Sequence, residues 1–136
     1  MDNTMNNPIV EYYKNGNIRA ERWKVNEVVH RVDKPASILY YENGTVEAKG
    51  FFLNGNFHNL NGPAMKRYTE SGILEAEIWL QNGLRHNLNG PAEIMYNNKG
   101  DIFHIEWCIK GKKIKNPPTT WPLNKEQQIE MKLKYG

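Results

Sequence analysis

Apolar and polar residues alternate in short runs along most of the chain, and Asn-Gly or closely related pairs separate the runs. Residues 73–80 (ILEAEIWL) are one such run. Alternation with a period of two is typical of a strand with one buried face, and Asn-Gly between two such runs is a strong hairpin signal. No helical period precedes residue 122. The pattern therefore predicts a mainly β chain built from antiparallel hairpins.

The same pattern returns every 28 residues. Turn glycines and three other sets of residues follow this step: Gly16, Gly44, Gly72 and Gly100; Tyr12, Tyr40, Tyr68 and Tyr96; Trp23, Phe51, Trp79 and Trp107; His30, His58 and His86. A fixed period of this length is the signature of a repeat architecture. We predict four stacked β-hairpin repeats that form one antiparallel meander, within a four-repeat sheet domain of residues 1–116. The repeats are expected at about residues 8–33, 34–61, 62–89 and 90–116.

The heptapeptide HNLNGPA occurs twice, at residues 58–64 and 86–92. Its Asn-Gly pair supplies a turn. Its proline stands where the next strand begins, a position that needs no backbone donor. We interpret the heptapeptide as the connection between repeats; a ligand-binding loop used twice is the alternative.

Residues 117–136 depart from the repeat and read as a proline-containing linker followed by a capping helix. Asn124 is the expected N-cap, and Gln127 completes a capping box with it. Ile129 and Leu133 are four residues apart and are expected to face the same way. We expect the helix to lie on the last repeat and to cover that end of the sheet, because terminal repeats need a cap.

Composition favours a folded chain of one domain. Of 136 residues, 39% are hydrophobic, and there are seven Tyr, four Trp and four Phe. Disordered chains are poor in aromatic residues. A single cysteine excludes a disulfide framework, and no apolar run approaches the roughly 20 residues that span a bilayer. We therefore expect an intracellular protein that is neither secreted nor inserted in a membrane.

Positive charge gathers near the C-terminus. Residues 110–136 contain seven lysines and only two glutamates, whereas the preceding residues are slightly acidic. A lysine cluster can neutralise nucleic-acid phosphates without sequence preference. Candidate polyanion contacts are Lys110, Lys112, Lys113 and Lys115; the alternative is a solvated end that keeps the protein soluble.

The histidine row and the aromatic row are the other candidates for interaction. Equivalent residues of stacked repeats lie roughly 10–14 Å apart, since neighbouring strands are about 4.8 Å apart. His30, His58 and His86 therefore cannot share one ion and read as turn or packing residues, with a row of partner contacts as the alternative. The aromatic row of Trp23, Phe51, Trp79 and Trp107 reads as packing, or as an exposed stripe that contacts a partner.

Nothing in the sequence indicates an enzyme. It contains no phosphate loop, nucleophile elbow or metal-spaced His/Cys set, and its only close carboxylate pair, Glu75 and Glu77, has no matching acid in the repeats. Cys108 aligns with the apolar residues Phe52 and Leu80, so we expect a core residue. We predict no catalytic residue, no metal and no cofactor.

The stretches YYENG…FFLNG…HNLNGPA and YTESG…IWLQNG…RHNLNGPA resemble the MORN-repeat superfamily. The likeness is to its degenerate 28-residue variant, found in YwqK-type antitoxins and in uncharacterised repeat proteins of giant DNA viruses, and it covers about residues 8–116. The resemblance implies an elongated, twisted antiparallel sheet used for protein contacts. It carries over no catalytic residue.

Together these observations predict a non-enzymatic repeat protein of a large DNA virus or its mobile elements, in the host cytoplasm or the virion. It would act as a protein–protein interaction or structural module. The expected partner is another protein, or a second copy that pairs through the first strand near residues 8–13. One alternative is a virion or genome-associated protein that binds DNA through the lysine-rich segment. The other is an antitoxin-like inhibitor of a partner protein.

Overall fold

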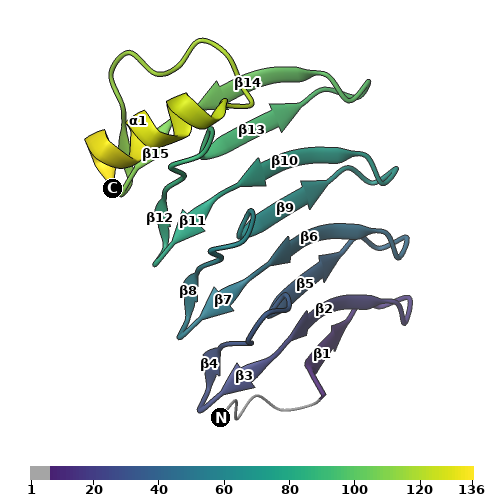
Figure 1. Cartoon of the computed structure of the whole chain (residues 1–136). Helices are drawn as coiled ribbons and strands as arrows, with labels where there is room; N and C mark the ends of the chain where they lie inside the picture. Colours follow the sequence, from purple (N-terminus) through teal and green to yellow (C-terminus); the bar gives the residue numbers. More distant parts are fainter. Residues whose placement is uncertain (1–6) are drawn as a thin grey trace.

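The computed structural model describes residues 7–136 and shows one eight-stranded antiparallel sheet in which each strand pairs with its neighbours in the strand sequence (Figure 1). Its strands are β1 (Ile9–Tyr12), β2 (Ile18–Arg22), β5 (Ser37–Tyr40), β6 (Val46–Gly50), β9 (Met65–Tyr68), β10 (Leu74–Ile78), β13 (Glu93–Tyr96) and β14 (Ile102–Glu106). The predicted meander of four hairpin repeats is thereby confirmed, and its two edge strands are β1 and β14.

A short hairpin follows each long one, and the four short hairpins stack along one end of the sheet (Figure 1). They are β3–β4 (Lys24–Val25, Val28–Val29), β7–β8 (Phe52–Leu53, Asn56–Phe57), β11–β12 (Leu80–Gln81, Leu84–Arg85) and β15–β16 (Cys108–Ile109, Lys112–Lys113). Backbone N–H groups of Gly55, Gly83 and Gly111 each donate to a carbonyl of the preceding short hairpin. The stack is therefore continuous from repeat to repeat.

The Asn-Gly pairs form the turns of the short hairpins, as predicted. Asn54 and Gly55 have φ angles of 51° and 83°, and Asn82 and Gly83 have 52° and 79°. A two-residue hairpin turn with both φ angles positive matches the twist of the flanking strands, and Asn and Gly adopt it at low cost.

The joint between repeats is built around a buried alanine. Ala64 is fully buried. Its N–H donates to the carbonyl of Ile78, and its carbonyl accepts from the N–H of Phe51. Ala36 and Ala92 make the equivalent pair of bonds. The Pro-Ala of HNLNGPA thus ties one repeat to the next, which supports the interpretation of the heptapeptide as a connection.

The helix α1 (Lys125–Tyr135) has the predicted capping box between Asn124 and Gln127. It packs through Met131 against Trp107, Ile109 and Leu123, over the last short hairpin (Figure 1). No helix among the described residues is long and apolar enough to cross a membrane.

The helix meets one expectation and corrects another. Ile129 and Leu133 lie on a common side, as expected, and this side faces solvent, with Leu133 83% exposed. The helix does not cover the outer strand, since Phe103 of β14 is 62% exposed. Met131 and Tyr135, also four residues apart, face the protein instead.

We expect Ala64→Val to destabilise the protein by about 1–3 kcal/mol, because the joint has no room for two further methyl groups. Ala48→Val is the matched control: Ala48 is half-buried and borders an open hollow, so its change should stay within about 0.5 kcal/mol. Urea denaturation of both variants measures the difference. Equal losses of unfolding free energy in the two variants would show that the joint is not packed more tightly than the position of Ala48.

Candidate functional site

Departures from the repeat gather on one face of the last hairpin. Three polar residues there replace apolar residues of the third repeat: Glu93 for Met65, His104 for Ala76, and Glu106 for Ile78. The stacking of repeats does not require these substitutions, because the fold accommodates apolar side chains at the same positions one repeat earlier. These three residues, called the Glu–His–Glu cluster below, are therefore candidates for a function of their own.

Strand register brings the cluster together. Glu93 of β13 lies directly opposite Glu106 of β14, and His104 is two residues away on the same face. The Nε2 atom of His104 lies 3.4 Å from Oε2 of Glu93 and 3.5 Å from Oε1 of Glu106. All three side chains are only partly exposed. Sequence reasoning missed this group. One signal was present: Ala20, Ala48 and Ala76 occupy this position in the other repeats, and His104 replaces alanine in the last one.

Two cations flank the carboxylates. Arg85 Nη2 lies 3.1 Å from Oε1 of Glu93, and Lys113 Nζ lies 3.2 Å from Oε1 of Glu106. The hydrogen bond from Lys113 lowers the pKa of Glu106. Partial burial opposes this shift, and nearby positive charges add to it. Glu106 is therefore ionised at neutral pH, and both carboxylates are already held by cations on the neighbouring short hairpins.

Cys108 is buried beneath this region, as predicted for a core residue. Burial, together with the negative charge of Glu106, raises the pKa of its thiol. A thiol with a raised pKa carries little thiolate at neutral pH, so Cys108 is poorly suited to act as a nucleophile.

Each histidine of the row holds the turn of the following repeat. Nδ1 of His30, His58 and His86 accepts the backbone N–H of Asn54, Asn82 and Lys110, respectively, at 3.0–3.1 Å. An accepting Nδ1 requires the neutral ring with its proton on Nε2. The row does not converge on one point, and its residues contribute to repeat stacking.

The aromatic row lies mostly in the interior. Trp23 and Trp107 are buried, and Phe51 and Trp79 are half-buried. The guanidinium of Arg31 lies 4.0 Å from the ring centroid of Trp23, a cation–π contact. The surface that these four residues offer to a partner is therefore limited.

On the opposite face of the sheet, two tyrosines of the row each bond a glutamate. The hydroxyl of Tyr40 donates to Glu21, and that of Tyr96 donates to Glu77. Burial and these carboxylates raise the pKa of both tyrosines to about 12, so both remain protonated. Glu77 also lies 3.9 Å from Lys66, which completes a structural network.

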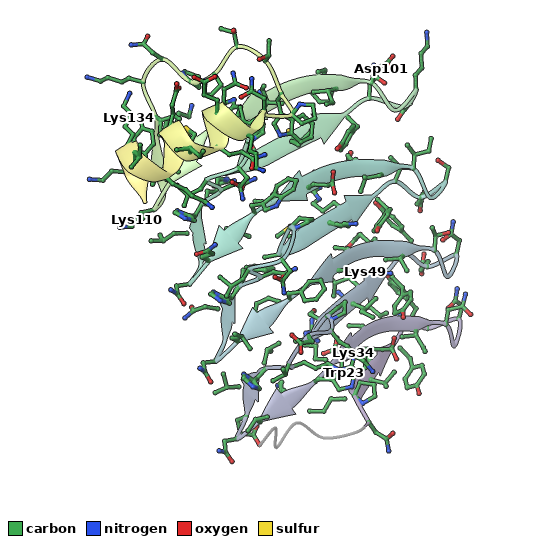
Figure 2. All side chains as sticks on the ribbon, in the orientation of Figure 1. Trp23, Lys34, Lys49, Asp101, Lys110 and Lys134 are labelled. Carbon is green, nitrogen blue, oxygen red and sulfur yellow. The ribbon has the colours of Figure 1, made fainter. Side chains whose placement is uncertain are left out.

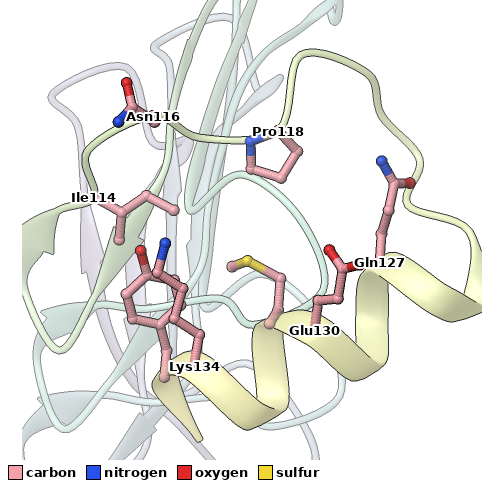
Figure 3. Close-up of a pocket in the computed structure, with 8 residues that line it drawn as sticks. Ile114, Asn116, Pro118, Gln127, Glu130 and Lys134 are labelled. Carbon is pink, nitrogen blue, oxygen red and sulfur yellow. The ribbon is translucent and has the colours of Figure 1, made fainter.

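Lysines cover the end of the stack. Lys110, Lys112, Lys113 and Lys115 are exposed on or beside β15–β16. Lys110 and Lys134 lie at the same end of the molecule, far from the Asp101 turn (Figure 2). A hollow of about 220 Å³ lies between the segment that follows this hairpin and α1, and is lined by mixed side chains that include Ile114, Gln127 and Glu130 (Figure 3).

A second hollow, of about 360 Å³, lies between the two copies of HNLNGPA. Asn59 and Asn87 border it, but each turns its amide inward: its oxygen accepts a backbone N–H two residues ahead, and its nitrogen donates to a proline carbonyl. Trp79 and Trp121 complete the wall. The first asparagine of each heptapeptide, Asn59 or Asn87, therefore already uses its side-chain amide to hold the loop.

The outer edge of β14 is open. Among the described residues it pairs only with β13, and Ile102, Phe103 and Ile105 are all exposed. The carbonyl of Glu106 accepts the N–H of Ala92 on the β13 side. Because backbone polar groups alternate in direction along a regular antiparallel strand, those of Ile105 point away from β13. A register shift at Phe103 interrupts the alternation, so it does not extend to that residue.

Comparison of the chain with models of known protein families, with curated proteins and with solved structures finds no match.

Acid should weaken the joint at His86. Burial, with a smaller contribution from Lys110, lowers the His86 pKa below its ordinary value of 6.5. At acidic pH, His86 therefore binds a proton more readily in the unfolded chain than in the folded one. The contribution of the neutral His86 to the free energy of unfolding is full above pH 6.5 and is lost as the pH falls through the folded pKa. We expect Lys110→Asn, which restores the residue of the other repeats, to raise the His86 pKa in an NMR titration. An unchanged His86 titration in that variant would contradict the assigned role of Lys110.

Proposed function

We propose that this chain is a non-enzymatic β-repeat protein that self-associates, and that the open edge of β14 is its binding surface. Its resemblance to the degenerate MORN-repeat variant supports this proposal, and we propose with it an origin in a large DNA virus or its mobile elements. In that setting the protein is a structural module of the host cytoplasm or the virion.

The single observation that carries the proposal is the unprotected edge. Soluble proteins usually blunt edge strands with lysine, proline or a covering segment, because an open ladder pairs with other strands. β14 has the sequence IFHIE, with no lysine or proline, and three exposed apolar side chains. In the part of the chain that the structure describes, no strand pairs with the side of β14 that faces away from β13.

The edge is also self-complementary. If two copies of β14 pair antiparallel about a twofold axis at His104, Phe103 of each copy lies opposite Ile105 of the other. Ile105 directs its backbone groups outward, where they can bond a partner strand, and the exposed side chain of Phe103 adds apolar surface to this edge. Aromatic and β-branched residues form favourable cross-strand pairs. A twofold axis gives a closed dimer instead of an open fibre.

The opposite edge is less suited to this role. Pro8 stands directly before β1 and has no N–H to donate. Glu11 of β1 is held by Arg22, which places a charged pair beside that edge. We therefore assign the pairing surface to β14 and not to the expected residues 8–13.

Light scattering coupled to size-exclusion chromatography tests the dimer. Ile105→Pro removes an outward N–H at a position where an edge strand tolerates proline, and Phe103→Lys adds a charge against the partner. Both should raise the dimer dissociation constant at least about tenfold, a loss of roughly 1.4 kcal/mol.

Leu60→Lys is the matched control, because Leu60 is 70% exposed on a loop remote from β14. It should dimerise like the wild type. A monomeric wild type, or a dimer that Ile105→Pro leaves intact, would contradict the proposal.

The basic hairpin favours a second candidate, DNA binding by a virion or genome-associated protein. Lys110, Lys112 and Lys115 are exposed and lie on or beside one hairpin, whereas Lys113 is already engaged by Glu106. Such a cluster gives affinity that falls steeply with salt.

Replacement of Lys110, Lys112 and Lys115 by alanine should weaken binding to a short duplex and reduce the salt slope by about two to three, since each lost phosphate contact removes about 0.9. Alanine at Lys14, Lys34 and Lys99 removes the same charge from exposed sites outside the β15–β16 hairpin. Fluorescence anisotropy of both triple variants decides the question: equal losses would indicate only an effect of net charge.

A further inference from the structure

We propose that the Glu–His–Glu cluster is a binding site for a zinc-like divalent metal ion. The chemistry of the donors fits: two carboxylates and one imidazole are ligands that zinc accepts. Three protein ligands with a fourth position open to solvent is the arrangement of zinc sites that keep a free position.

The distances fit as well. Four ligands at about 2.0–2.1 Å in a tetrahedron lie about 3.3–3.4 Å from one another. His104 Nε2 lies 3.4 and 3.5 Å from the nearest oxygens of Glu93 and Glu106. The two carboxylate oxygens and the imidazole nitrogen all lie within 4.8 Å of one another. Small side-chain rotations would therefore suffice to close the site on one ion.

The surroundings hold the ligands in place. Arg85 contacts Oε1 of Glu93, whereas Oε2 of the same carboxylate faces His104. This leaves one oxygen for an ion while the other is fixed, as bonded neighbours commonly orient metal ligands. All three ligands lie on paired strands and not on loops.

Lys113 is the competitor. Its ammonium and His104 both face Oε1 of Glu106, so an ion must displace it. The Lys113 side chain is 75% exposed and can turn into solvent. The site is thus expected to bind metal more tightly once this cation is removed.

The repeat provides a non-disruptive way to remove a ligand. Ala20, Ala48 and Ala76 occupy the position of His104 in the other repeats. His104→Ala should therefore fold, and a thermal melt checks that it does. This variant also keeps His30, His58, His86 and Cys108, so it separates the cluster from the other metal-binding side chains of the chain.

Titration calorimetry with Zn²⁺ tests the proposal. Wild type should bind one ion per chain. His104→Ala and Glu106→Gln should each weaken binding by at least about 10-fold, because the loss of a residue that only orients a metal ligand already costs about 10-fold to 100-fold. Lys113→Ala should bind several-fold more tightly. Cys108→Ala should bind as wild type does.

Co²⁺ provides a second readout, because its visible absorption distinguishes tetrahedral from octahedral coordination. Tetrahedral bands in the wild type that disappear in His104→Ala are the expected result. A flat Zn²⁺ titration of the wild type, or equal affinity in His104→Ala, would show that the cluster is an ion-pair network alone and would overturn the proposal.

Discussion

The structure depends on hydrogen bonds to backbone groups at the joint between repeats. Ala64 accepts from Phe51 of the preceding repeat and donates to Ile78 of its own repeat, and His58 accepts the N–H of Asn82 in the following repeat. A single-layer sheet has little interior, so a lone hairpin unit cannot bury enough surface to fold. These bonds make each repeat the support of its neighbour. They also explain why a small residue follows proline at the joint: the two backbones approach too closely for a larger side chain.

This constraint acts on only a few positions of each unit. The turn residues, the aromatic ring, the joint alanine and the turn-holding histidine recur because stacking needs them. Positions on the faces of the long strands are free to differ, as Met65 and Glu93 show at equivalent places. A group of polar residues that appears at such positions in one repeat alone is therefore not explained by folding. The Glu–His–Glu cluster is a group of this kind.

Much of the fold could be predicted because short-range sequence patterns determine it. Alternating runs predicted the strands, Asn-Gly pairs predicted the turns, and Asn124 with Gln127 predicted the start of the helix. The helix face could not be chosen from the sequence, since Ile129/Leu133 and Met131/Tyr135 are both four residues apart. Only the position of Trp107 beneath the helix decides between these pairs.

The candidate site was harder to predict for a physical reason. Glu93 and Glu106 meet through strand register, which depends on the turn between β13 and β14. A one-residue slip would place them on opposite faces. The role of His30, His58 and His86 was similarly hidden, because each acts on a backbone group 24 residues ahead. Spacing showed that they cannot share an ion, but not what they hold.

The two proposed surfaces share strand β14, and His104 lies at the centre of the proposed pairing. His104 and Glu106 point to one face, whereas Ile105 points to the other and turns its backbone groups to the open edge. A partner strand at that edge would therefore leave the carboxylate face accessible. It would also pair β14 on both sides, which restricts the motion of an edge strand. Because metal affinity depends on holding ligands at fixed distances, pairing at the edge should favour ion binding on the face, and an ion that fixes β13 to β14 should favour pairing in return.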